Sequence, residues 1–472
     1  MTFNPGSRHP LYTAFAPFWR LMRDAVDGED AIKAKGTTYL PMKSGIVAMT
    51  DLGKQSQAYE AYKLRAEFPE LVAPTIRGSV GTMLEKPAVI ELPDALEPMR
   101  EKATRDSMTL DALHRRITVE LLTVGRYGLL PGIANDGSPY LAGYVTEAIT
   151  NWDDTDHVVD WLMLDESKKV LDRSTGMWTD LERYRECYVE EGRYHSRLWT
   201  LGKGGWDADE PVAASGPAKR GQERPIEFLP FVFIDAMDLS ADPDDVPLYG
   251  LAKLAVRVYR MDADYTFALH MTSEPTPVAI GFDSPADAVK EGKAPTTLGS
   301  SKLWLLPKGG DAKYLEFSGP GLEQQAKAID ATLQRAIIFG AQLFAENKRT
   351  AESGEAIKTR LGNQLATLRS IALNSAAGLE KALKNIATWV GADPNKVKVT
   401  PNLDFADHTL TAQEITAIVA GWQASAYSWR TAFDRLQKGG IIPDDRKPEV
   451  ELALIDEDQV TFEDEKAATI LG

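Results

Sequence analysis

The stretch YGLAKLAVRVYRMDADYTFALHMT, Tyr249–Thr272, has the character of one long helix and decides how the centre of the chain is built. Pro247 precedes it, and Pro275 and Pro277 follow it. Proline is favoured in the first turn of a helix and excluded from its interior, so these residues mark the limits of the run. A second run, GLEQQAKAIDATLQRAIIFGAQLFA, covers Gly321–Ala345. Each run would be about 38 Å long at 1.5 Å per residue, and the matched lengths predict an antiparallel pair.

The segment between the two runs is predicted to form a compact β insert at the tip of the pair. Short strand-like stretches lie between Gly and Pro turns at Val278 to Phe282, Leu303 to Leu306 and Tyr314 to Phe317. At the other end of the first run, Asp244 or Asp245 could serve as its N-cap. The sequence therefore predicts a two-helix stalk that carries a small β-containing element.

A polar segment, ENKRTAESGE at Glu346 to Glu355, follows the second run. A third long helix is predicted at Ala356 to Gly391, where apolar residues recur mostly every three or four positions. Its stripe consists of Leu361, Leu365, Leu368, Ala372, Leu379, Leu383, Ile386 and Val390. Beyond it the tail is predicted to be helical at Thr411 to Gln437 and then acidic from Asp444 to Glu465.

The first 245 residues have a mixed α/β pattern, which makes the predicted fold class α+β and mainly helical. Helices are predicted at Leu11 to Val26, Gln55 to Phe68 and Leu110 to Val124. Two hairpins are predicted, Leu129 to Ala134 with Tyr140 to Ile149, and Arg185 to Val189 with Tyr194 to Leu201. Gly202 to Pro225, rich in Gly, Ala and Pro, is predicted to be an exposed loop before a strand at Ile226 to Ile234.

Composition excludes several classes of protein. The chain of 472 residues has 53 basic and 69 acidic side chains and a formal net charge of −16, which disfavours a static nucleic-acid binder. Cys187 is the single cysteine, so an intramolecular disulfide and a cysteine-based zinc site are excluded, and assembly in a reducing cytoplasm is indicated. The sequence has no apolar stretch long enough to predict a membrane span, and its amino end has no secretory signal pattern.

Motifs for catalysis are missing, so we predict neither enzyme activity, nor a metal, nor a cofactor. LGKGGW at Leu201 to Trp206 lacks the glycine spacing and hydroxyl residue of a phosphate-binding loop, and RGSVG at Arg77 to Gly81 is better read as a helix turn. The acidic pairs Asp153 with Asp154 and Asp244 with Asp245 could hold magnesium, although solvated loops or helix caps explain them equally simply. The histidines, His9, His114, His157, His195, His270 and His408, are scattered singly.

Two features point to assembly instead. Apolar side chains occupy more than one face of the first long run, and a helix buried on several sides needs neighbours, which a ring of subunits would supply. The candidate subunit contacts are Leu251, Leu254, Tyr259, Tyr265 and Leu269. The second feature is the pair of cations in the polar segment, Lys348 and Arg349, which belong either to an ordinary helix connection or to a loop that faces a polyanion.

The order of elements resembles the portal protein of tailed bacteriophages, and particular phrases resemble a portal-like phage family long labelled a domain of unknown function. These phrases are YEAYKLRAEFPELVAPTIRGSVGTMLEKP (Tyr59 to Pro87), LLTVGRYGLLP (Leu121 to Pro131), ADYTFALHMTSEPTPV (Ala263 to Val278), GGDAKYLEFSGPGL (Gly309 to Leu322) and the helix after AESGEA (Ala351 to Ala356). The resemblance implies an α/β wing at residues 1–246, stem helices at 247–272 and 321–345, a small β-containing clip at 273–320, a tunnel loop at 346–355, a long kinked wing helix at 356–398 and a helical crown at 399–472.

The resemblance also implies a setting and partners. Portals of this kind form a ring of twelve subunits at one capsid vertex of the virion, and double-stranded DNA passes through the ring during packaging and ejection. They contact the large terminase subunit, head-completion or adaptor proteins, and the major capsid and scaffolding proteins. The DNA-facing residues would be those of the tunnel loop, Asn347, Lys348, Arg349, Thr350 and Glu352. Two alternatives are another virion adaptor or baseplate protein, and a hydrolase that uses an unrecognised carboxylate pair.

Overall fold

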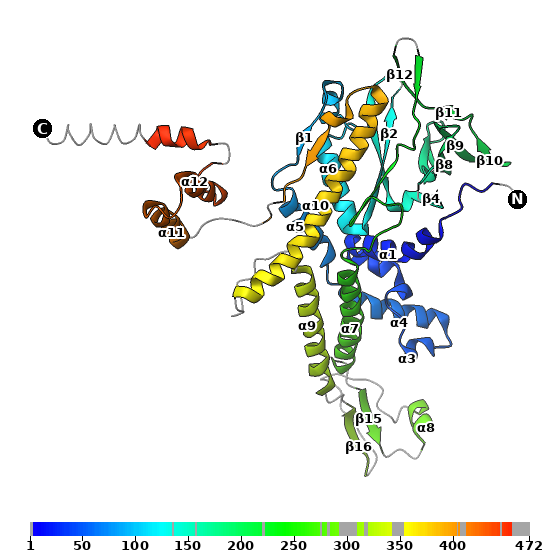
Figure 1. Ribbon diagram of the computed structural model, residues 1–472. Helices are drawn as coiled ribbons and strands as arrows, with labels where there is room; N and C mark the ends of the chain where they lie inside the picture. Colours follow the sequence, from blue (N-terminus) through cyan, green and yellow to red (C-terminus); the bar gives the residue numbers. More distant parts are fainter. Residues whose placement is uncertain are drawn as a thin grey trace. The chain divides into compact units, whose positions relative to one another are not determined.

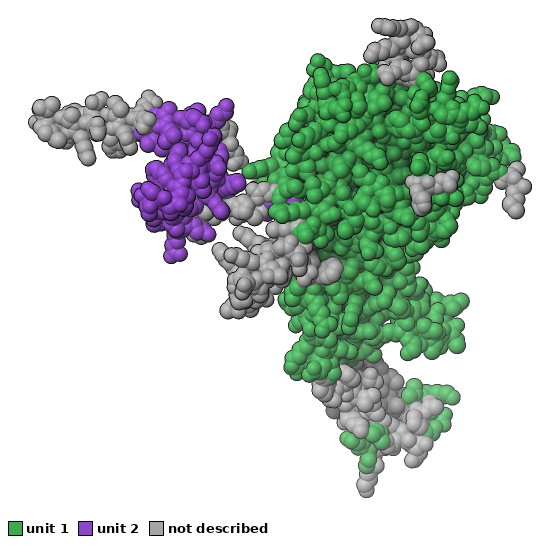
Figure 2. Space-filling model, in the orientation of Figure 1, with its two compact units in different colours: residues 1–403 green, residues 404–472 purple. Residues whose placement is uncertain are grey.

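The computed structural model describes residues 3–134, 136–155, 158–219, 222–273, 276–280, 284–291, 309–315, 320–341, 354–403, 405, 412–443 and 446–455. The chain divides into two compact units, Met1–Leu403 and Asp404–Gly472, which we describe separately (Figure 2). Among the described helices, none combines the length and the apolar character needed to cross a membrane.

Antiparallel sheets form the upper body of the first unit (Figure 1). One sheet has the order β10-β9-β8-β5-β4 with β11 also paired to β9, and another has the order β14-β2-β3. Four two-stranded pairs are β1-β17, β6-β7, β12-β13 and β15-β16. The strands are β1 (Val89–Glu91), β2 (Arg126–Ile133), β3 (Pro139–Val145), β4 (Ile149–Asp153), β5 (Trp161–Asp165), β6 (Lys168–Asp172), β7 (Met177–Leu181), β8 (Arg183–Glu190), β9 (Arg193–Gly202), β10 (Gly205–Ala208), β11 (Val212–Ala213), β12 (Ser215–Lys219), β13 (Gln222–Pro225), β14 (Val232–Asp235), β15 (Thr276–Ile280), β16 (Asp311–Leu315) and β17 (Lys398–Thr400).

Helices make up the rest of this unit, and the α+β, mainly helical class is confirmed. They are α1 (Pro10–Asp27), α2 (Glu29–Ala34), α3 (Ser44–Val47), α4 (Leu52–Arg65), α5 (Val72–Met83), α6 (Leu110–Val124), α7 (Tyr249–Ser273), α8 (Pro285–Lys290), α9 (Pro320–Ala341) and α10 (Gly354–Val390). Short 3-10 turns lie at Gly36–Thr38, Asp94–Arg100, Thr146–Ala148 and Pro394–Lys396. The helices expected around α1, α4, α6, α7, α9 and α10 are all present, and the RGSVG sequence lies inside α5 as expected.

The core of the first unit lies where α10 crosses the sheet β14-β2-β3 beside α6 (Figure 1). The apolar stripe of α10 faces this core, because Leu368, Leu379, Leu383 and Ile386 are all buried. Gly378 sits at the contact with β14, where an added Cβ would lie 2.6 Å from the Cδ1 atom of Ile234. A glycine in mid-helix normally destabilises, but here it permits the backbone to approach the sheet closely.

The hairpin of β8 and β9 shows local sequence determining local structure. Glu190 pairs with Arg193, so Glu191 and Gly192 form a two-residue turn. Both turn residues have positive φ, 51° and 69°, as a type I′ turn requires. The predicted hairpin and its turn are therefore confirmed, as is that of β2 and β3, except that β3 ends at Val145 rather than Ile149.

The prediction of an exposed loop from Gly202 to Pro225 was wrong. The chain there forms β10 and β11, which pair with β9, and the hairpin β12-β13. A free edge of β9 offers backbone hydrogen bonds to any extended segment, so pairing overrides the weak strand propensity of Gly and Pro. The following strand is also shorter than expected, since only β14 is regular within Ile226 to Ile234. Leu201 to Trp206 forms the surface hairpin of β9 and β10, as predicted.

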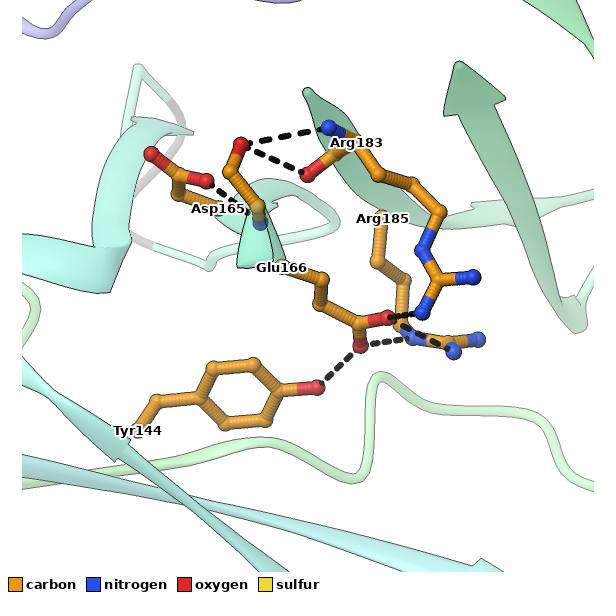
Figure 3. A network of polar contacts seen from close by, with 6 residues as sticks. Tyr144, Asp165, Glu166, Arg183 and Arg185 are labelled. Atoms are coloured by element: carbon orange, nitrogen blue, oxygen red, sulfur yellow. Dashed lines mark hydrogen bonds and ion pairs between the residues drawn. The ribbon is translucent and has the colours of Figure 1, made fainter. Parts of the chain in front are cut away.

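Polar pairs tie β5 and β8 to β3 at the junction between the two larger sheets (Figure 3). The carboxylate of Glu166 accepts hydrogen bonds from the Tyr144 hydroxyl at 2.7 Å and from Nε of Arg185 at 2.6 Å. Arg183 places a second guanidinium 3.7 Å away. Although burial raises the pKa of Glu166, these partners outweigh it and hold the pKa below its ordinary value. The site is a structural brace, and the acidic side chain remains charged.

The second unit contains α11 (Ala412–Gln423) and α12 (Trp429–Lys438) where one helical segment was expected. The chain turns at Ser425, whose φ is 58°, and the Ser428 side chain caps α12 by accepting a hydrogen bond from the Thr431 amide. Trp422 and Trp429 then pack together, with ring centroids 5.2 Å apart. The aromatic pair that suggested one continuous helix instead closes the turn between two.

Candidate functional site

The candidate site is the antiparallel pair of α7 and α9, which extends from the body and carries β15 and β16 at its far end (Figure 1). The two helices have 25 and 22 residues in the described parts of the chain. The hydroxyl of Thr332 lies 3.9 Å from the sulfur of Met261, which fixes the level at which they meet. On α9, Ile329, Thr332 and Ala336 form the buried face at the spacing of one helical side.

The insert at the tip has the expected β character. Five cross-strand pairs join β15 to β16, from Thr276 opposite Leu315 to Ile280 opposite Asp311. The short helix α8 lies between these strands in the sequence. The third predicted strand, Leu303 to Leu306, lies outside the described residues.

The base of the pair is anchored to the body through β14 and β2. Arg126 and Asp235 are opposite each other across these strands, and both side chains are buried. The Nη2 atom of Arg126 donates to the carbonyl of Ala241, 2.6 Å away, in the segment that leads to α7. Asp244 accepts a hydrogen bond from the Met237 amide at 2.6 Å. The suggestion that Asp244 or Asp245 caps α7 was wrong, because α7 begins at Tyr249, and Asp244 instead closes the preceding loop.

The first half of α7 is braced by the amino-terminal helices. The Tyr62 hydroxyl donates to Asp264 at 2.7 Å, and the Glu67 amide donates to Asp262 at 2.8 Å. Nε of Arg260 donates to the carbonyl of Tyr39 at 2.6 Å. These contacts fix the direction in which α7 leaves the body, and α7 in turn positions α9 and the insert.

The structure separates the five expected subunit contacts into two groups. Leu251 and Tyr259 are almost fully enclosed by their own chain, with 0% and 1% of their surface exposed. Their apolar character is therefore satisfied within one subunit. Leu254 and Tyr265 are half-buried, and Leu269 is 38% exposed, so these three keep surface for a partner. The tunnel-loop residues, Asn347, Lys348, Arg349, Thr350 and Glu352, lie outside the described residues.

A cationic groove beside the pair was not identified from the sequence. It has a volume of about 860 Å³ between α1, the turn at Thr38 and Tyr39, and α7. Its four cations are Arg20, Lys253, Arg257 and Arg260. The spacing of the three on α7 places them on one helical face, which was a usable signal. Arg20 comes from α1, and only the tertiary structure brings it to that face.

The described side chains offer little for catalysis. No group of three or more His, Cys, Asp or Glu among them could hold a metal ion. Burial raises the pKa of Cys187 to about 12, so its thiol is not a nucleophile near neutral pH. Asp153 accepts hydrogen bonds from the amide and hydroxyl of Thr155, which is the solvated-loop arrangement expected of it. His114 is buried against Ser375, and His9 caps α1.

Comparison with known proteins gives one family match and two weak structural ones. Residues 247–390, which span α7, the insert, α9 and α10, match a family described as a domain of unknown function, DUF4055. No curated protein matches. The neck of a native GTA particle computed with C12 symmetry is similar at 13% identity, over 76% of this chain and 86% of that one, with a TM-score of 0.36. The neck of an empty GTA particle computed with C6 symmetry is similar at 14% identity, over 79% and 90%, with a TM-score of 0.36.

Proposed function

We propose that this chain is a portal subunit of a tailed bacteriophage or a related particle, a structural virion protein that forms a ring through which double-stranded DNA passes. The observation that carries the proposal is the α7 and α9 pair, which stands out from an α/β body with a small β element at its far end. A single pair has exposed sides that a ring of identical neighbours would cover. Subunits with two different complementary faces close into a ring when the rotation between them closes.

The charge of the chain suits a channel that DNA must leave again. A net charge of −16 repels the phosphate backbone and prevents tight binding along the wall. Contacts with DNA would then be confined to a few cations, for which Lys348 and Arg349 are the candidates. In this proposal the insert at the tip is the docking point for the large terminase subunit and for head-completion proteins.

The first test is the size of the purified protein. We expect a ring of twelve subunits, which at 51.9 kDa each has a mass of about 620 kDa by light scattering or native mass spectrometry. Negative-stain images should show rings with a central hole and the stalks on one side. A chain that remains at 51.9 kDa at micromolar concentration, with no rings in the images, would contradict the proposed function.

The second test addresses the tunnel loop. Replacing Lys348 and Arg349 together by glutamine should leave the ring intact but lower the amount of DNA packaged or retained, because the loop loses its charge contacts with phosphate. The measurement is the DNA content of particles complemented with wild-type or variant protein. The matched control is Arg115→Gln on the exposed side of α6, which should package normally. Normal packaging by the double variant would remove these two residues from the proposal.

A further inference from the structure

The groove between α1 and α7 carries positive charge that its own chain does not neutralise. Within the described part of the chain, none of Arg20, Lys253, Arg257 and Arg260 forms an ion pair with a carboxylate. Arg260 uses one nitrogen on the Tyr39 carbonyl, and the Lys253 ammonium lies 5.5 Å from the Tyr249 ring. Unpaired cations gathered in one place on an acidic chain indicate an anionic partner.

The walls of the groove indicate that this partner is a protein. Apolar side chains stand between the cations, namely Pro17, Leu21, Leu254, Val256 and Met261. A phosphate backbone gains nothing from contact with such surface, whereas apolar side chains from a protein would be removed from water there. The groove therefore suits a ridge that has both an acidic and an aliphatic part.

The exposed side of α9 has this composition. Ile337 and Ile338 are 39% and 51% exposed, although isoleucine is among the residues most often buried. Asp330 is also exposed and lies two turns earlier on the same side. Together these three residues form what we call the α9 ridge. Helical periodicity turns the ridge away from Ile329, Thr332 and Ala336, which face α7, so its own subunit leaves it uncovered.

The groove and the ridge also lie at the same height along the pair. Thr332 is level with Met261. Because the helices are antiparallel, Ile337, five residues after Thr332, is level with Val256, five residues before Met261. By the same count Asp330 is level with Ala263, about 4.5 Å along the axis from Arg260 at 1.5 Å per residue. Rotation about an axis nearly parallel to the helices preserves height, so it would bring a ridge level with the groove of another copy.

We infer that the groove of each subunit receives the α9 ridge of the next subunit in the ring. Ile337 and Ile338 enter between Leu254 and Val256, and Arg260 faces Asp330. This inference rests on the proposed ring and assigns its contact to two different surfaces of the chain, the head-to-tail arrangement that a closed ring needs. Leu254, one of the three candidate contacts that keep free surface, lies within the groove.

Charge reversal at both sides tests the contact. Arg260→Glu and Ile338→Asp should each raise the protein concentration needed for ring formation by about tenfold or more, because each leaves an unpaired charge in the contact. Asp330→Arg should do the same when it is made alone. The double variant Arg260→Glu with Asp330→Arg should recover rings at the wild-type concentration. Mass photometry over a dilution series measures the fraction of subunits in rings.

Matched controls distinguish loss of the contact from loss of the fold. Arg115→Glu on α6 and Leu64→Asp on α4 place the same changes on exposed helix positions and should assemble normally. Each variant is also checked by circular dichroism and thermal unfolding. Rings that form normally in all ridge and groove variants, with the fold retained, would overturn this contact while the proposed function stands. Normal rings with weaker duplex DNA binding by Arg260→Glu would overturn it in favour of DNA as the occupant. A wild-type chain without rings would overturn the proposed function itself.

Discussion

Replacing Arg126 by methionine is expected to lower the free energy of unfolding by about 3–5 kcal/mol, the usual loss when one partner of a buried ion pair is removed. Arg126 and Asp235 are 1% and 0% exposed, and Nε lies 3.5 Å from Oδ1. Burial raises the pKa of Asp235 well above its ordinary value, and the Arg126 guanidinium opposes this rise. Without Arg126, the carboxyl would remain buried with no cation beside it.

The surroundings of Arg126 explain why methionine is the informative replacement. The guanidinium carbon lies 4.8 Å from the centre of the Trp152 ring and 4.7 Å from that of Phe233. Methionine keeps an unbranched apolar stem between these rings and removes only the charge and the donors. Urea unfolding followed by fluorescence measures the loss, and exposed Arg115→Met should change stability by less than about 0.5 kcal/mol.

A double variant isolates the pair. Arg126→Met with Asp235→Leu removes both charges, so it should lose less stability than the two single variants added together. The segment held by Arg126 through Ala241 leads directly into α7, so the single variant should also loosen the base of the stem. A loss below about 1 kcal/mol for Arg126→Met would show that the pair does not anchor the stem.

The second large effect is a dependence of stability on pH that comes from His114. Burial lowers the pKa of His114 from 6.5 to about 4, a change that nearby Asp111 only partly opposes. Its Nε2 atom lies 3.1 Å from the Ser375 hydroxyl, so the ring links α6 to the middle of α10. Between pH 6.5 and 4 the unfolded chain binds a proton at this residue, and the folded chain does not.

The direction of the effect follows from that difference. The contribution of His114 is fully present above pH 6.5 and is lost as the pH falls toward 4, by about 3 kcal/mol in total. We expect His114→Gln, which can keep a hydrogen bond to Ser375, to lose less stability over this range by about that amount. Urea titrations at several pH values compare the two proteins. Parallel losses of stability in both would exclude His114 as the source.

The sequence by itself determined the elements whose signals are local. The helices of α6, α7, α9 and α10 follow from apolar spacing and from the prolines and glycines at their ends. The turn at Glu191 and Gly192 needs two residues with positive φ, so the β8-β9 hairpin could be placed from four or five residues. The equal lengths of the two stem runs predicted their pairing, and α7 and α9 do pack together.

Strand pairing and burial were decided only by the tertiary structure. The strand β5, WLMLD, is one short apolar run whose periodicity cannot distinguish strand from helix, and pairing with β4 and β8 resolves it. The segment after Gly202 becomes strands because the edge of β9 is available. Both outcomes depend on hydrogen bonds to distant residues, which leave no pattern in the local sequence.

The candidate site divides in the same way. Periodicity showed that α7 has apolar residues on several sides, but it could not say which neighbour covers each of them. The fold covers Leu251 and Tyr259 from within the chain, leaves Leu254 in a groove, and brings Arg20 from α1 beside Arg257. Helical spacing fixes which residues share a face, whereas burial depends on what packs against that face, and only the folded chain supplies those neighbours.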